Sequence, residues 1–134
     1  MSLLIDQLAA YLEGEGEGTV GADIFKRHRP SSPLACVSIH GTGGYPPDRY
    51  TQRERPTVML FARAGAPDAA ERKAYGLYGK LHGKQNVDLG GGMWALTIEA
   101  LNSPAYVGTE QAAGQTAHLV SFNIALDLRT PSAP

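Results

Sequence analysis

Four histidines and one cysteine are the side chains of this chain best suited to binding a metal ion, and they are far apart in the sequence. They are His28, Cys36, His40, His82 and His118. Zinc sites usually draw on ligand pairs only a few residues apart, and a cysteine site needs a second cysteine. The spacing therefore predicts no metal site, and the single cysteine, in an alternating apolar segment, is typical of a small buried residue.

The glycine-rich segment Gly41–Gly44 invites comparison with a phosphate-binding loop. Such a loop binds phosphate because a helix begins directly after the glycines. Here Tyr45-Pro46-Pro47 follows, which forbids that helix, and the lysine of the motif is absent. The Gly-x-Ser-x-Gly turn of serine hydrolases is also missing, and no carboxylates are paired for acid–base work. The sequence thus predicts a protein that is not an enzyme and needs no cofactor.

The segment 43–56 is a rigid, aromatic and basic loop between two predicted strands. Arginine and tyrosine are favoured at protein interfaces, but arginines interleaved with aromatic side chains can also bind nucleic acid. Asp48 and Glu54 would alternatively form local salt bridges in a solvated loop. All three interpretations stay open, and a protein interface is favoured. Its candidate residues are Tyr45, Arg49, Tyr50, Arg53 and Arg55.

Length and composition are those of one ordinary globular domain. The 134 residues are 43% hydrophobic and 19% charged, which suits a single domain over 1–130 followed by a short flexible tail over 131–134. The net charge of −1 gives no electrostatic case for binding DNA or an anionic membrane. No apolar run approaches the roughly 20 residues that span a bilayer, and the first residues lack the basic start of a signal peptide.

Hydrophobic spacing predicts two helices. The first covers 3–13, with Ser2 as N-cap and an apolar stripe at helical spacing, and the acidic, glycine-rich segment 14–18 after it is expected to be a solvated linker. The second begins at Pro67 or Asp68 and ends at His82, with Gly83 after it. Leu77 of this helix is expected in the core.

Alternating segments predict strands over 23–28, 35–40, 56–63, 87–89, 93–101 and 118–128. The segment 56–63 is apolar on both faces, so we expect it to be central, with Pro56 tolerated only as its first residue. The glycines 90–92 predict a hairpin turn, and Trp94 is expected in the core. Long loops are expected over 41–55 and 102–116. The order predicts an α+β fold, a mainly antiparallel sheet with two helices packed on it.

Several short motifs, in this order, resemble the tailed-bacteriophage minor capsid proteins related to tail terminators, also called tail-to-head joining proteins. The resemblance covers about 3–128. It is carried by Gly43-Gly44-x-Pro46-Pro47, Glu54-Arg55-Pro56 before a strand ending at Arg63, Ala74-Tyr75, Leu81-His82-Gly83, Ser103 to Gly108 and Val120 to Asn123. One departure concerns the loop after Gly108, where Glu110 stands for the family's acidic residue but the following arginine is missing.

The resemblance implies a tail-terminator-like structural protein of the virion neck, without a cofactor. Such proteins form a ring, usually a hexamer, that caps the tail tube and joins it to the head–tail connector. The implied partners are further copies of the chain, the tail tube protein and the connector or stopper protein, with viral DNA only passing through the lumen and no membrane contact. Assembly would take place in the host cytoplasm. Tyr106 and Glu110, in the second long loop, join the candidate interface residues.

Three other functions remain open from the sequence. A head-completion or connector protein would occupy a different place in the same particle. A small enzyme or ligand-binding domain would need a pocket that joins two histidines with a carboxylate. A nucleic-acid-binding protein would show an affinity that depends steeply on salt.

Overall fold

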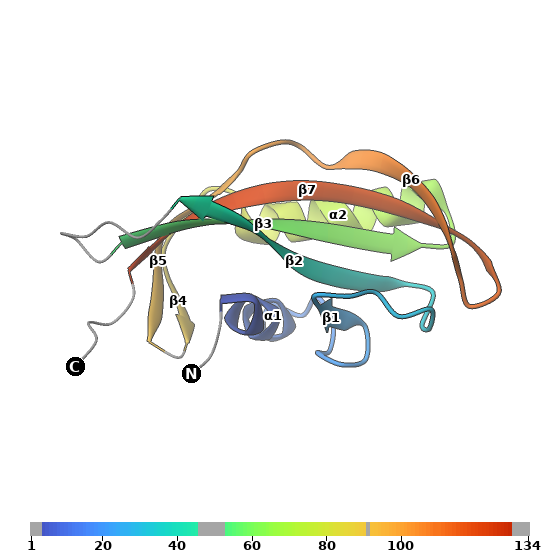
Figure 1. Cartoon of the computed structure of the whole chain (residues 1–134), viewed down its shortest axis with the longest axis horizontal. Coiled ribbons are helices and arrows are strands. Elements are labelled where there is room, and N and C mark those ends of the chain that lie inside the picture. Colours follow the sequence, from blue (N-terminus) through green and yellow to red (C-terminus); the bar gives the residue numbers. More distant parts are fainter. Residues whose placement is uncertain (1–3, 46–52, 91, 130–134) are drawn as a thin grey trace.

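The computed structural model describes residues 4–45, 53–90 and 92–129. Its elements follow one another in a mixed order of helices and strands (Figure 1). They are α1 (Leu4–Gly14), β1 (Ile24–Lys26), β2 (Cys36–Tyr45), β3 (Arg53–Ala64), α2 (Pro67–Leu81), β4 (Lys84–Gly90), β5 (Met93–Ala100), β6 (Ala105–Ala112) and β7 (Gln115–Arg129).

All seven strands belong to one sheet of order β1-β2-β3-β7-β5-β4, and β6 also pairs with β7. β1 runs parallel to β2, and every other pair is antiparallel. The long strand β7 lies at the centre (Figure 1). One edge of β7 pairs with β3, and its other edge is shared by β5, along 124–129, and β6, along 115–121. The predicted α+β fold with a mainly antiparallel sheet is therefore confirmed, and β3 is central as expected.

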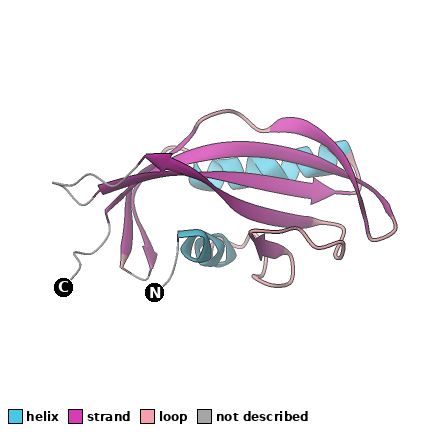
Figure 2. Ribbon diagram, viewed as in Figure 1, coloured by secondary structure: helices cyan, strands magenta, loops and turns pink. Residues whose placement is uncertain are grey.

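Both helices pack on one face of this sheet, where the main core lies (Figure 2). Each helix buries a leucine stripe against alternate side chains of the strands, such as Leu60 and Phe122. Burying one such side chain contributes about 1.5–3 kcal/mol. The helices also touch each other, because the Tyr11 hydroxyl donates to the Lys80 carbonyl oxygen at 3.3 Å. The stripe residues are Leu8, Leu12, Leu77 and Leu81, all with no exposed surface.

Helix α2 forms where its sequence predicts it. Pro67 occupies its first turn, where the missing N–H costs nothing. Ala70 and Ala74 face the sheet and are fully buried, and their small side chains let the helix approach β3 and β7 closely. At the other end the N–H of His82 donates to the Tyr78 carbonyl oxygen at 2.8 Å, and Gly83 has a φ of +78°. A left-handed residue at this position is a common helix stop.

The acidic segment after α1 is not the solvated linker that the sequence predicts. The ammonium group of Lys73 donates to the Glu17 carboxylate at 3.0 Å and to the Glu17 carbonyl oxygen at 2.6 Å. The N–H of Val20 donates to the Glu13 carboxylate at 2.7 Å. The prediction failed because the basic partner lies on α2, 56 residues further along the chain. The acidic side chains thus attach this turn to α2.

The prediction that Trp94 belongs to the core is wrong, because Trp94 is 40% exposed. A β-bulge in β5 causes the difference. Ala95 pairs with Leu128 and Thr97 with Asp127, which leaves the residue between them as an extra one. The bulge reverses the inward and outward alternation, so that Ala95 and Ile98 are the buried residues of β5. Simple alternation from Ile98 would have placed Trp94 inside.

Both predicted long loops are shorter than expected, because long-range pairing extends the strands. β2 continues to Tyr45, which pairs with Arg55, and Gly44 pairs with Pro56. Pro56 is thus the fourth residue of β3 rather than its first. The ladder between β3 and β7 passes from Glu54 directly to Thr57, as expected where a proline cannot donate a hydrogen bond. Most of the second loop forms β6 against β7.

β1 is also shorter than predicted. It ends at Lys26, and Arg27 has a φ of +71°, which takes the chain out of the extended conformation. The N–H of Arg27 still donates to the Ile39 carbonyl oxygen at 2.8 Å. Beyond Ile39, β1 no longer borders β2.

Candidate protein interface

The sheet face that points away from the helices is only partly covered. Side chains alternate along a strand, so residues neighbouring the buried Val58 and Leu60 point to this second face. It is mixed in character, and the hydroxyl groups of Thr42 and Thr57 form a hydrogen bond on it at 2.7 Å. We call it the open face. Its residues are Thr42 of β2, Arg55, Thr57 and Met59 of β3, Asn123, Ala125 and Asp127 of β7, and Thr97 and Glu99 of β5.

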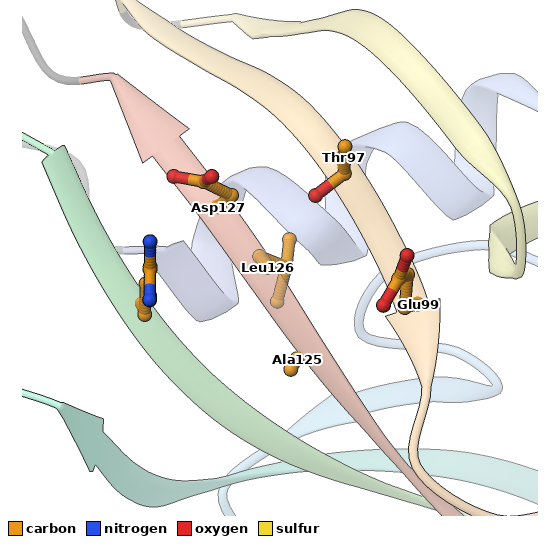
Figure 3. Close-up of a pocket in the computed structure, with 6 residues that line it drawn as sticks. Thr97, Glu99, Ala125, Leu126 and Asp127 are labelled. Carbon is orange, nitrogen blue, oxygen red and sulfur yellow. The ribbon is translucent and has the colours of Figure 1, made fainter.

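A hollow of about 240 Å³ lies on the open face, over β3, β7 and β5. Ala125 lies across from Thr57 on one side and Glu99 on the other. Its single methyl group leaves space between longer neighbours, which is why the surface is hollowed there. The carboxylates of Glu99 and Asp127 and the hydroxyl of Thr97 project from the two strands at this place (Figure 3). The lining residues are Arg55, Thr97, Glu99, Ala125, Leu126 and Asp127.

The other end of this sheet face is covered by the segment 29–34, which is held by a buried arginine. The side chain of Arg63 is only 2% exposed. Its guanidinium donates to the carbonyl oxygens of Leu34 and Pro33, each at 2.8 Å, and to that of Pro30. It also donates to the Glu110 carboxylate at 2.7 Å. A buried charge is tolerated only with such complete hydrogen bonding, so Arg63 fastens the segment to the sheet.

Glu110 lies between two arginines. Arg29 donates to both of its carboxylate oxygens, at 3.1 and 3.2 Å, while Arg63 donates to one of them. The pKa of Glu110 is lowered, mainly by the hydrogen bond from Arg29. Burial acts in the opposite direction, and the hydrogen bond from Arg63 lowers the pKa further. The Arg29 guanidinium also lies 4.3 Å from the ring centre of Phe61. Glu110 is thus engaged within its own chain, and its predicted role as an interface residue stays a prediction.

The predicted interface residues do not form one patch. Arg55 lies at the hollow of the open face. Tyr106 is 53% exposed and lies on the helix side of the sheet, where its hydroxyl is 2.9 Å from Nδ1 of His118. Tyr45 and Arg53 are the last residue of β2 and the first of β3. The remaining two, Arg49 and Tyr50, lie outside the described residues.

Among the described residues, four exposed large apolar side chains were not among the predicted interface residues. Trp94 lies across from Arg129 on the same sheet face as the hollow, and tryptophan and arginine are the residue types most often found at the centres of protein interfaces. Alternation had assigned Trp94 to the core, and Val107 fell in the segment 102–116, which was predicted to be a loop. Residue type alone does not show that these side chains are exposed, because exposure depends on which face of the strand or helix each one occupies. They are Tyr75, Trp94, Leu101 and Val107, which are 46%, 40%, 60% and 55% exposed.

The residues first considered for metal chemistry serve local contacts. His40 Nε2 is 3.0 Å from the Ser38 hydroxyl, and burial, with the charge of Arg29, lowers the pKa of His40. Nδ1 of His82 accepts the Ala100 N–H at 2.9 Å. Cys36 is buried, and burial raises the pKa of its thiol. Across the described ranges, these side chains do not gather into a cluster of three or more metal ligands.

The fold defines a class of small α+β proteins whose sheet carries helices on one face and a partly open surface on the other. A family model of bacteriophage tail terminator proteins matches residues 11–129. The chain therefore belongs to the bacteriophage tail terminator family, and the resemblance seen in its motifs is confirmed. It is a structural component of the phage tail. No curated protein matches the chain. None of the helices that the structure describes is long and apolar enough to cross a membrane.

Proposed function

We propose that this protein forms a ring, with a hexamer as the expected order, that caps the end of the tail tube and joins it to the head–tail connector. The observation that carries the proposal is the family match over residues 11–129, which covers α2 and the whole sheet. The partners would be further copies of the chain, the tail tube protein and the connector or stopper protein. DNA would only pass through the lumen, with no membrane contact.

The proposed unit of the ring is one domain over 1–130, followed by the short tail 131–134. A single continuous sheet with a shared core supports one rigid body rather than two. Such a body suits a structural role, because a ring subunit must keep its contact surfaces in a fixed relation. We propose that the ring assembles on tails in the host cytoplasm.

A closed ring needs two different surfaces on each copy, one that meets the preceding copy and one that meets the next. Contacts to the tube and to the connector require further surfaces. The open face, with its hollow, Arg55 and the nearby Trp94, is the surface that we assign to another tail or neck protein. Its mixed charge and exposed tryptophan resemble the composition of protein interfaces.

Omitting the protein during phage assembly tests this function. We expect tails and filled heads that remain separate, together with a ring at the head-proximal end of the tail in particles that contain the protein. Electron microscopy of both preparations, with an affinity label on the chain, gives the position directly. Heads and tails that join normally without the protein would contradict the proposal, as would a label found away from the head-proximal end of the tail.

A further inference from the structure

The sheet has unpaired strand edges on its two opposite sides. On one side, β2 is bordered by β1 only along Val37–Ile39. From His40 onward, the outer edge of β2 has no strand partner among the residues that the structure describes. On the other side, β6 pairs with β7 along its inner edge, and no described strand pairs with its outer edge. Backbone groups at such edges are ready to accept another strand.

The edge of β6 has few of the features that usually protect a free edge. Soluble proteins discourage pairing with lysine, proline or a break in the strand. β4, the other free edge on this side, carries Lys84 and has a φ of +54° at Asn86. β6 has neither lysine, arginine nor proline, and it exposes Tyr106 and Val107. Its irregularities are confined to a bulge at Val107 and a φ of +148° at the neighbouring Gly108. Of the two, β6 is the edge suited to a partner.

The free part of β2 complements β6 in shape. It reads Gly41-Thr42-Gly43-Gly44, so it presents backbone with few side chains, with a bulge between Gly41 and Gly44 and a φ of +92° at Gly43. A Cβ atom added at Gly43 would meet nothing within 4 Å in its own chain. Glycines in a strand are unfavourable unless another backbone or a large side chain covers them. Tyr106 and Val107 of a second copy are side chains of the right kind to cover this edge.

Strand direction favours the same pairing. From β2 through β3 and β7 to β6, each strand runs opposite to the one before it. Rotation about an axis that is moderately tilted from the strands keeps this alternation of directions. Therefore β6 of one copy would run antiparallel to β2 of the next, and the alternation would continue from copy to copy without a break. Antiparallel pairing of this kind is how extended segments add to a free sheet edge.

The pairing also requires a shift of each copy along the strand direction relative to its neighbour, and the size of this shift fits a closed sheet. Tyr106 pairs with Val120, which pairs with Ala62. Ala62 pairs with Val37, so Tyr106 lies level with Val37 of its own copy. Gly41 of β2 faces Ile5 of α1 and so lies on the same sheet face as Tyr106. It is four residues beyond Val37, which is about 14 Å along an antiparallel strand. The four strands are about 19 Å wide. Pairing Tyr106 with Gly41 of the next copy therefore corresponds to a strand tilt of about 35°, within the range of closed sheets.

We propose that neighbouring copies in the ring are joined edge to edge, with β6 of one copy beside residues 40–45 of β2 of the next. The occupant of each edge is a second copy of this chain. The inference rests on the proposed ring and specifies the contact that builds it. It also gives the two different surfaces that a closed ring requires, on opposite sides of one subunit.

Mixed cysteine cross-linking tests the contact. Full-length Thr42→Cys and Val107→Cys proteins are prepared separately, because Thr42 and Val107 are exposed and lie on the two edges. After assembly, a short bismaleimide is added to each variant and to their mixture. We expect a covalent dimer in the mixture, several-fold above either variant alone, and a ladder of larger products from the double variant. The wild-type chain gives the background from the buried Cys36.

A matched control replaces Val107→Cys by Lys84→Cys, on the exposed outer edge of β4. Oligomer mass is measured independently, in concentrated solution and on tails. Rings that give the Thr42–Val107 product but not the Thr42–Lys84 product support the proposal. Rings without the Thr42–Val107 product, or with the Thr42–Lys84 product instead, overturn the edge pairing and leave the ring in place. Absence of an oligomer under both conditions overturns the ring and, with it, this contact.

Discussion

The guanidinium of Arg63 lies 2.7 Å from the carboxylate of Glu110, although 47 residues separate them in the sequence. This contact joins the end of β3 to β6, the strand that we place at the boundary between copies. Because Arg63 also binds the carbonyl oxygens of the segment 29–34, one buried side chain fixes three distant parts of the molecule.

Removing the carboxylate should destabilise the protein. In Glu110→Ala the buried Arg63 loses its only anionic partner among the contacts that the structure gives it. Breaking such a pair from one side typically costs about 3 kcal/mol, and chemical denaturation measures the loss in the free energy of unfolding. Glu99→Ala, at an exposed position of β5, is the control and should change stability little. Equal effects of the two substitutions would refute a special role for Glu110.

The same contact should make stability depend on pH. The arginines lower the pKa of folded Glu110, so its contribution is complete above the unfolded value of about 4.3. The contribution is then lost as the pH falls through the folded pKa. We expect the wild-type chain to lose stability more steeply than Glu110→Gln below about pH 4.3, measured by thermal unfolding across pH. Parallel profiles of the two proteins would contradict this assignment.

Trp94→Ala should cost much less stability than truncation of a core aromatic residue. Trp94 is 40% exposed, whereas Phe122 is 1% exposed. We expect Phe122→Ala to cost about 3–5 kcal/mol and Trp94→Ala about 1 kcal/mol, by chemical denaturation. If Trp94 contributes to an interface, its loss should weaken assembly on tails in a protein that remains folded. A cost for Trp94 similar to that for Phe122 would show that it is a core residue after all.

Charge reversal at Arg53 and Arg55 should weaken ring assembly or docking while the monomer stays folded. Arg55 lies at the hollow of the open face beside the carboxylates of Glu99 and Asp127. Arg53 begins the same strand. Circular dichroism follows folding, and light scattering or sedimentation on tails follows assembly. Arg72→Glu, on the exposed surface of α2, serves as a control for charge alone. Unchanged assembly in both variants would count against the interface interpretation.

The sequence predicted the parts of the fold that depend on local pattern. The leucine stripe of α1, the start of α2 at Pro67 (predicted at Pro67 or Asp68) and the pairing of β4 with β5 as a hairpin were all correctly inferred. The apolar character of β3 on both faces predicted its central place. In each case the signal lies within about fifteen residues, where the spacing of apolar side chains reflects the period of one helix or strand.

The candidate interface was less predictable. Arg55 was selected by residue type, and the structure places it at a hollow. No local pattern predicts that hollow, because it depends on Ala125 lying between two strands that are distant in the chain. Trp94 was misplaced because a single extra residue in β5 reverses which side chains face the core.

By itself, then, the sequence determined the family, the two helices, the central strand and the α+β class. Only the tertiary structure decided that 105–112 forms β6, that Trp94 is exposed and that Arg63 binds Glu110. The physical reason is the same for all three. Strand pairing and burial of charge depend on partners brought together from distant parts of the chain. The local spacing of residues does not indicate which distant segment will be the partner.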